Sequence, residues 1–211
     1  GQVMKGLNDK GLVIFLLITF LITWIPTFAA MILGLEYGSG AVHFILTYSM
    51  LCPALGMLAT RYLTKEGFKL TGEKSLMLGI SFANKKLFFY LLALLLPIIY
   101  RDLGCGLIFL LQPQCFDLSV MKEMTGLSWG YFWVLPLTGV VNAVMISFGA
   151  LGEEAGWRGY MMPKLEEKFG IVPAVLIGGV IWGVWHFPAN YMGHNFGTGY
   201  FGEPWSGFLL F

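Results

Sequence analysis

Two adjacent carboxylates and an arginine lie in apolar surroundings. Glu153, Glu154 and Arg158 follow the uncharged run 134–151. A charged side chain at the centre of a bilayer costs about 2.5–3.5 kcal/mol even on the lenient scales, so such residues usually mark a functional site. We therefore take these three residues as the first candidates for chemistry.

A histidine ends the next apolar stretch, in the sequence Trp182-Gly183-Val184-Trp185-His186. A carboxylate and an imidazole that meet inside a membrane can activate a water molecule as general bases. They can also bind a divalent metal ion such as zinc, which lowers the pKa of the bound water. The residues leave both readings open, and Glu153 and His186 are the metal ligands if a metal is bound.

Helical spacing separates the charged residues into two groups. Glu154 and Arg158 are four positions apart, so their side chains can meet on one helix face. Glu153 is rotated from Glu154 by about 100° and points elsewhere. This pattern predicts a supporting ion pair and one carboxylate directed at His186. The plainer alternative is that Glu154 and Arg158 only hold the bundle together and that His186 only bonds a backbone carbonyl. We favour a functional site, because four ionisable residues are expected at similar depth in the membrane: Glu153, Glu154, Arg158 and His186.

Composition indicates a polytopic membrane protein of the all-α class. Of the 211 residues, 57% are apolar and 12% are charged, whereas about a quarter of a soluble domain is charged. Helices satisfy their own backbone hydrogen bonds in lipid, so a transmembrane helical bundle is expected. The expected location is the cell membrane, in a multi-pass arrangement, with lipid as a partner. A net charge of +1 gives no indication of nucleic acid binding.

At least five apolar segments approach or exceed the roughly 20 residues that a membrane span requires. In the third, Arg101 and Asp102 leave open one helix or a helix followed by a turn. The fourth is longer than one crossing requires, so either it projects into the cytosol or Gly149 and Gly152 break it. The segments cover 11–35, 41–63, 87–111, 129–162 and 171–188, and 205–211 would open a sixth. We therefore expect one transmembrane domain over 1–211, truncated at its C-terminus, with its catalytic core at about 129–211.

Lysine and arginine distribution predicts the orientation. Basic residues gather before the first span, in 61–86 and in the charged turn 164–170, while the alternate connections hold one or none. The positive-inside rule then gives a cytosolic N-terminus. Glu153 lies about 15 Å from Pro163, the expected cytosolic helix end, and His186 about 22 Å from Ile171. The two residues can share one layer of the membrane.

Two motifs carry a family resemblance. Glu153-Glu154-x-x-x-Arg158, followed on the next span by Trp182-x-x-x-His186, resembles the CPBP family of intramembrane proteases, the CAAX prenyl protease and bacterial Abi group. The resemblance implies an intramembrane endopeptidase that hydrolyses a peptide bond in a membrane-associated protein or peptide. It also implies that Glu153 and His186 activate the attacking water, with Glu154 and Arg158 in support. The family is described both as glutamate-type and as metal-dependent.

The family's third motif, a His-x-x-x-Asn on a later helix than the one that carries His186, has no match here. His194 is followed four residues later by Thr198 and falls in an expected outer loop, and His43 has no motif partner, so we read it as structural. We expect truncation of the chain to account for the missing motif. The alternative function is a non-catalytic bacteriocin-immunity or scaffolding membrane protein of the same family. A small transporter or proton relay ranks third, because no internal repeat is visible.

Overall fold

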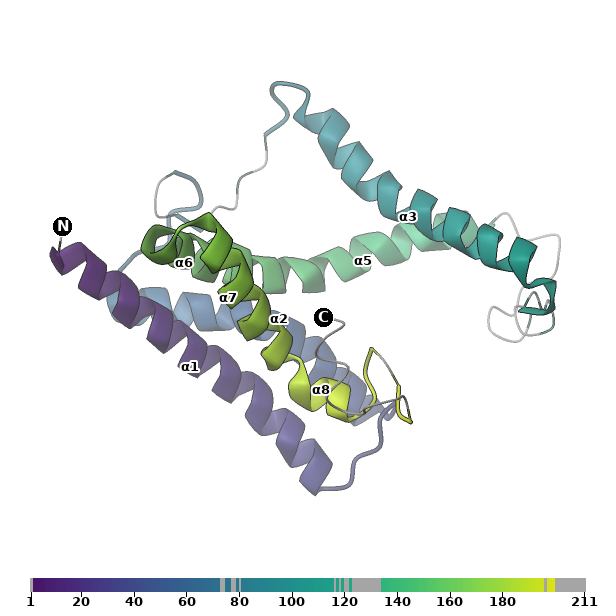
Figure 1. The fold of residues 1–211 in the computed structure, drawn as a ribbon, viewed down its shortest axis with the longest axis horizontal. Helices are drawn as coiled ribbons and strands as arrows, with labels where there is room; N and C mark the ends of the chain where they lie inside the picture. The colour runs from purple at the N-terminus through teal and green to yellow at the C-terminus, as the bar shows by residue number, and fades with distance from the viewer. Residues whose placement is uncertain are drawn as a thin grey trace. The chain divides into compact units, whose positions relative to one another are not determined.

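The computed structural model describes residues 2–72, 75–76, 79, 81–115, 117, 119, 122, 134–195 and 197–199. Within these residues the regular elements are helices, which confirms the all-α class (Figure 1). They are α1 (Gln2–Ile32), α2 (Gly40–Thr64), α3 (Lys86–Leu111), the 3₁₀ turn η1 (Pro113–Cys115), α5 (Val134–Gly156), the π-helical turn η3 (Trp157–Met161), α6 (Met162–Phe169), α7 (Ile171–Trp185) and α8 (Phe187–Tyr191).

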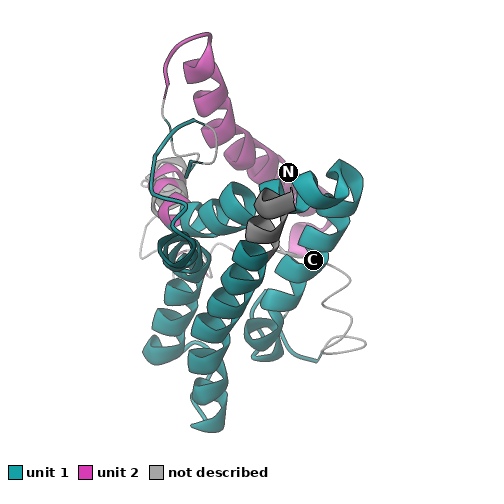
Figure 2. Cartoon of the chain, turned by 90° about the vertical axis from the view of Figure 1, so that its left-hand side faces the viewer, with its two compact units in different colours: residues 1–79, 149–211 teal, residues 80–148 magenta. Residues whose placement is uncertain are grey.

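The chain forms two compact units (Figure 2). Unit 1 comprises residues 1–79 and 149–211, and unit 2 comprises residues 80–148. Every candidate site residue belongs to unit 1. The expected single domain over 1–211 stays a prediction.

Among the described residues, three helices are long and apolar enough to cross a membrane: Lys10–Ile32, Gly40–Thr64 and Lys86–Leu111. They match the first three predicted spans. The third is one continuous helix that contains Arg101 and Asp102, whose side chains form an exposed ion pair 2.8 Å long. The fourth and fifth spans contain α5 and the 15-residue apolar helix α7. Residues 205–211 lie outside the described residues, and the number of spans and their orientation stay predictions.

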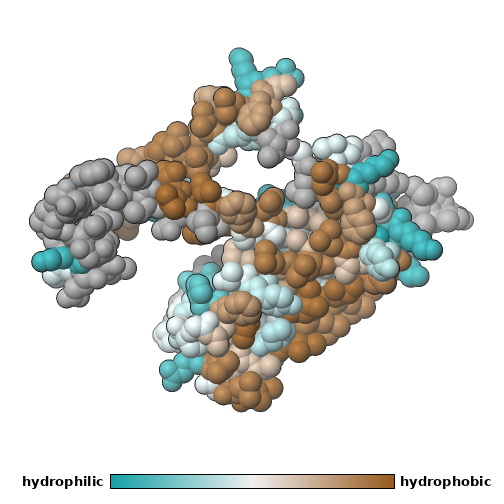
Figure 3. All heavy atoms as spheres, turned by 180° about the vertical axis from the view of Figure 1, so that it is seen from behind, coloured by the Kyte–Doolittle hydropathy of each residue, from teal (hydrophilic) through white to brown (hydrophobic). Residues whose placement is uncertain are grey.

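Large apolar side chains cover much of the described surface. Figure 3 shows wide hydrophobic areas on the face that it displays, with hydrophilic residues in small separate groups. Leu17, Leu21 and Ile25 of α1 are each more than half exposed. An apolar exterior of this kind is what a helix presents to lipid.

Small and hydroxylated residues hold α1 against α2 in unit 1. Thr19, Thr23 and Thr27 are buried at successive turns of α1. A Cβ atom added at Gly56 of α2 would collide with the Thr19 hydroxyl. Small residues let membrane helices approach closely, and this contact replaces the hydrophobic drive that water would supply.

The end of α5 lies against the middle of α2 through two glycines. A Cβ atom added at Gly152 would lie 2.6 Å from the backbone oxygen of Met50, and one at Gly156 would collide with Pro53. Only glycine fits at these two positions. The possible break at Gly149 and Gly152 is not found, because α5 continues through both residues.

The helical path continues beyond the predicted end at Met162. After the π-helical turn η3, α6 runs to Phe169, so the prediction of a charged turn at 164–170 is wrong for 164–169. Pro163 does not end the helix, because it occupies the first turn of α6, where no intrahelical N–H donor is needed. Leu165 is buried on one face of α6, while Glu166, Glu167 and Lys168 are exposed. This amphipathic pattern was hidden by the high charge of the segment.

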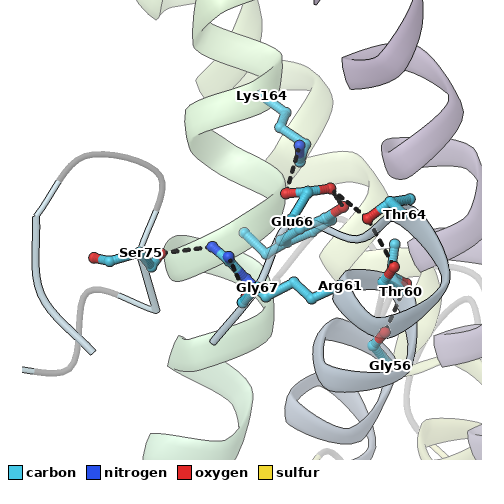
Figure 4. Close-up of polar contacts among 9 residues, drawn as sticks. Gly56, Thr60, Arg61, Thr64, Glu66, Gly67, Ser75 and Lys164 are labelled. Carbon is cyan, nitrogen blue, oxygen red and sulfur yellow. Dashed lines mark hydrogen bonds and ion pairs between the residues drawn. The ribbon is translucent and has the colours of Figure 1, made fainter. Parts of the chain in front are cut away.

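A carboxylate outside the apolar spans joins the end of α2 to η3 and α6 (Figure 4). Glu66 accepts hydrogen bonds from Tyr160 (2.7 Å) and Thr64 (2.9 Å), and its other oxygen lies 3.2 Å from Nζ of Lys164. We call these four residues the Glu66 clasp. Burial alone would raise the pKa of the Glu66 carboxyl, but the bond from Tyr160, the charge of Lys164 and the bond from Thr64 hold the pKa below its ordinary value.

Arg61 secures the segment that follows α2. Its side chain is buried, and its guanidinium donates to the backbone oxygens of Gly67 (3.0 Å) and Ser75 (2.6 Å) (Figure 4). It also lies over the ring of Tyr160, 5.7 Å from the ring centroid. Two carbonyls and an aromatic ring thus surround a cation that would otherwise be costly to bury.

Candidate active site

Glu153 and His186 line one cavity in unit 1. Its volume is about 620 Å³, within the range of cavities that bind small molecules or short peptide segments. The lining residues come from α1, the α1–α2 turn, α2, α5, α7, α8 and the turn after α8: Thr23, Thr27, Tyr37, Gly38, Gly40, Val42, His43, Leu46, Thr47, Ser49, Met50, Glu153, Trp185, His186, Pro188, Ala189, His194 and Asn195. The two residues that the motifs single out therefore face a common space.

Glu153 is half-buried near the end of α5. Its Oε2 accepts a hydrogen bond of 3.0 Å from the indole N–H of Trp182 on α7. Among the described residues no cation lies within ion-pair distance of this carboxylate. Glu153 is thus held in direction without being neutralised.

His186 caps the C-terminal end of α7 and is half-buried. Its Nδ1 lies 2.8 Å from the backbone oxygen of Trp182. A carbonyl can only accept, so Nδ1 carries the proton, and in the neutral ring Nε2 is the basic nitrogen. The ring of Trp185 lies edge-on to the imidazole, with centroids 4.9 Å apart. These contacts fix both the tautomer and the orientation of the ring.

Glu154 and Arg158 form the ion pair that their spacing predicts, with 2.9 Å between Oε2 and Nε. Their side chains are 44% and 66% exposed, so the pair is not among the residues that line the cavity. The guanidinium of Arg158 lies 5.5 Å from the centre of the Trp182 ring. Arg158 therefore contacts Trp182, which donates to Glu153. The ion pair itself lies on a different face of the helix from Glu153.

Several polar residues that the motifs do not indicate line the same cavity, among them Tyr37, His43 and His194. The hydroxyl of Tyr37 lies 3.0 Å from Nδ1 of His194, which joins the α1–α2 turn to the turn after α8. Tyr37 and His194 lie in connections and His43 lies in the first turn of α2. None of the three belongs to a periodic pattern, so only the folded chain brings them to the site. Whether His43 has more than a structural role stays untested.

The ligand set for a metal is incomplete among the described residues. They contain no group of three His, Cys, Asp or Glu close enough to hold one ion. A catalytic zinc site uses three protein ligands, and Glu153 with His186 supplies two. The described residues alone do not fit a zinc site.

An all-helical membrane protein with a glutamate and a histidine on one interior cavity defines the class. Comparison with known proteins gives the family. Residues 126–210 match the model of the type II CAAX prenyl endopeptidase Rce1-like family, a region that contains Glu153, Glu154, Arg158 and His186. This match supports the resemblance to the CPBP/CAAX protease family that the two motifs indicated, and the chain is a multi-pass membrane protein.

A curated relative supports the family. The CAAX prenyl protease 2 of Methanococcus maripaludis is 26% identical over 113 residues. The match covers 49% of this chain and 41% of the relative's length. No solved structure matches the chain.

Proposed function

We propose that the chain is an intramembrane endopeptidase that hydrolyses a peptide bond in a membrane-associated protein or peptide. The observation that carries the proposal is that Glu153 and His186, from the two family motifs, line the same cavity. The CAAX prenyl endopeptidase match over both motifs supports the reaction class. The same match gives no support to a non-catalytic immunity or scaffolding role.

In the proposed reaction, Glu153 and Nε2 of His186 together remove a proton from a water molecule in the cavity. The water oxygen attacks the carbonyl carbon of the scissile peptide bond and forms a tetrahedral intermediate. The C–N bond then breaks, and the proton taken from water passes to the leaving nitrogen. General base catalysis of this kind contributes about 10²–10⁴-fold.

Glu154 and Arg158 have a supporting role in this proposal. Their ion pair neutralises two charges beside the site and keeps the Arg158 guanidinium over the ring of Trp182. The second carboxylate next to Glu153 is thereby occupied, which leaves one carboxylate for chemistry. The roles of the two neighbouring glutamates differ because their partners differ.

The substrate class follows from the family and from the surroundings. A substrate must reach a cavity among helices whose exterior is apolar, so a lipid-anchored or membrane-embedded chain has an advantage over a soluble one. A prenylated peptide that ends in a CAAX sequence is the natural probe, and the same peptide without its prenyl group tests whether lipid is needed.

The test is cleavage of an internally quenched, prenylated CAAX peptide by the purified chain in lipid nanodiscs. We expect Glu153→Ala and His186→Ala each to abolish cleavage, by at least about 10³-fold, since each removes a group that contacts the reacting water. Glu166→Ala is the matched control, because Glu166 is an exposed carboxylate of α6 outside the cavity. Full activity in Glu153→Ala would contradict the proposal.

A further inference from the structure

One residue contacts three of the four motif side chains. Trp182 donates its indole N–H to Oε2 of Glu153 (3.0 Å). Its backbone oxygen lies 2.8 Å from Nδ1 of His186. Its ring lies under the guanidinium of Arg158, which is 5.5 Å from the ring centroid. Both proposed bases are therefore oriented by the same tryptophan, through two different groups of that residue.

The ring of Trp182 is itself held in place. It stacks on Trp157 of η3, with centroids 6.1 Å apart and an angle of 29° between the ring planes. Trp157 is fully buried between Phe15 of α1 and Trp185 of α7. A donor on a packed ring has little freedom to rotate, so its direction can determine that of the carboxylate it bonds.

The two contacts of Trp182 indicate which atom of Glu153 and which atom of His186 can act on the water. An indole N–H can only donate, so Oε2 of Glu153 is the accepting oxygen and Oε1 remains for the water. The backbone carbonyl places the proton of His186 on Nδ1 and the lone pair on Nε2. The same residue thus selects one atom of each base.

We infer that Trp182 is a positioning residue of the proposed peptidase, and that its indole N–H aims the carboxylate of Glu153 at the water that His186 also contacts. The inference rests on the proposed function. Its chemistry is specific: a phenylalanine at this position would keep an aromatic ring under Arg158 but could not donate to Glu153.

The sharpest test replaces only the N–H. Benzothienylalanine at position 182 has nearly the shape of tryptophan but carries sulfur in place of the N–H, and it leaves the backbone contact to His186 intact. Trp182→Phe is the simpler companion variant. We expect kcat for the prenylated CAAX peptide to fall about 10- to 100-fold in both, with KM unchanged within about twofold, since a misdirected base slows chemistry without weakening binding.

Trp24→Phe is the matched control. The indole of Trp24 also donates a 3.0 Å hydrogen bond to α7, at the backbone oxygen of Trp185, but it bonds neither Glu153 nor His186 and does not line the cavity. It loses the same kind of bond, so a general loss of packing would lower its activity equally. We expect its kcat to stay at the wild-type value.

A double-mutant cycle measured by thermal unfolding gives a second test, which does not depend on catalysis. If the indole bonds the carboxylate, the fall in Tm caused by Trp182→Phe should shrink when Glu153 is already alanine. Equal falls in both backgrounds would overturn the inference.

The kinetic results distinguish a failure of the role of Trp182 from a failure of the proposed peptidase function. Wild-type kcat with benzothienylalanine, while Glu153→Ala is inactive, would overturn the role of Trp182 and leave the peptidase intact. A raised KM with unchanged kcat would also overturn it, because Trp182 would then contact substrate. Cleavage by Glu153→Ala would remove the proposed function and this inference with it.

Discussion

Two glutamates of unit 1 have opposite surroundings. Glu66 is bonded by Tyr160 and Thr64 and paired with Lys164. Glu153 accepts one indole hydrogen bond, has no cation beside it among the described residues, and lines a cavity of about 620 Å³. The first carboxylate is paired with a cation, and the second is oriented by a hydrogen bond without a cation beside it among the described residues.

This difference separates a structural carboxylate from a chemical one. A carboxylate whose two oxygens both have hydrogen-bond or ion-pair partners stabilises the fold but is a poor base. A general base must keep a lone pair for the proton that it removes. We therefore expect substitutions at Glu66 to change stability and substitutions at Glu153 to change activity.

The isosteric substitution at each glutamate should give the clearest contrast. Glu153→Gln keeps the shape and can still accept from Trp182, but it cannot take a proton, so we expect cleavage to fall at least about 10³-fold with Tm unchanged. Glu66→Gln should retain cleavage. Peptide turnover and thermal unfolding, measured on both variants in the same nanodiscs, test the division. Equal losses of activity would end the distinction between the two carboxylates.

The helix that carries Glu153 can be displaced from α2 by one methyl group. A Cβ atom at Gly152 would lie 2.6 Å from the backbone oxygen of Met50, and we expect Gly152→Ala to cost about 1–3 kcal/mol through overpacking. Cleavage should fall as well, since Glu153 is the next residue. Gly179→Ala on α7 is the control, because nothing lies within 4 Å of its added Cβ atom. Equal unfolding free energies for the two variants would contradict the close approach of α5 and α2.

The Glu66 clasp should contribute measurable stability. Glu66→Gln removes the charge that Lys164 faces and weakens the bond from Tyr160, so we expect a loss of about 1–2 kcal/mol. Glu167→Gln, an exposed position on α6 outside the clasp, should cost less. Denaturant unfolding at neutral pH measures both. A loss at Glu66 no larger than at Glu167 would mean that the clasp adds nothing.

The same clasp should make stability depend on pH in one direction. The pKa of Glu66 is lowered in the folded chain, so its contribution is complete above the unfolded value of about 4.3 and is lost as pH falls through the folded value. The difference in unfolding free energy between wild type and Glu66→Gln should be constant from pH 7 to 5. It should shrink on further acidification, and a difference that grew instead would contradict the lowered pKa.

Chelation should have the smallest effect. Water activation by Glu153 and His186 alone needs no metal ion, so dialysis against EDTA should leave cleavage unchanged. A zinc peptidase assayed beside it shows that the treatment removes metal. Loss of cleavage that is restored by Zn²⁺ would instead place a metal at the pair and revise the mechanism.

The features that the sequence predicted are local in the chain. The first three spans follow from long apolar runs, and the Glu154–Arg158 pair follows from a spacing of four residues. Both depend on helical periodicity, which is visible in any window of a few turns. For the same reason the all-helical class needed no tertiary information.

The features that were not predicted depend on contacts between distant segments. Glu66 and Tyr160 are 94 residues apart, and Trp182 and Glu153 are 29 apart on different helices. No pattern within one helix encodes such partners. The helical state of α6 was missed for another reason: its charged residues suggested a turn, while the burial of Leu165 against the core is what favours the helix.

The π-helical turn η3 gives the chain an additional residue within one turn. The backbone N–H of Met162 bonds the oxygen of Trp157, five residues earlier, where an α-helix would use the fourth. The side chains after the turn are therefore rotated about the helix axis by about 100° from the directions that they would have in an uninterrupted α-helix. An uninterrupted α-helix through the same residues would turn Lys164 away from Glu66, whereas deleting one residue in the turn would restore α-helical bonding and keep the direction of Lys164. Relatives without the π-helical turn should therefore align to this chain with a gap of one residue between Trp157 and Met161.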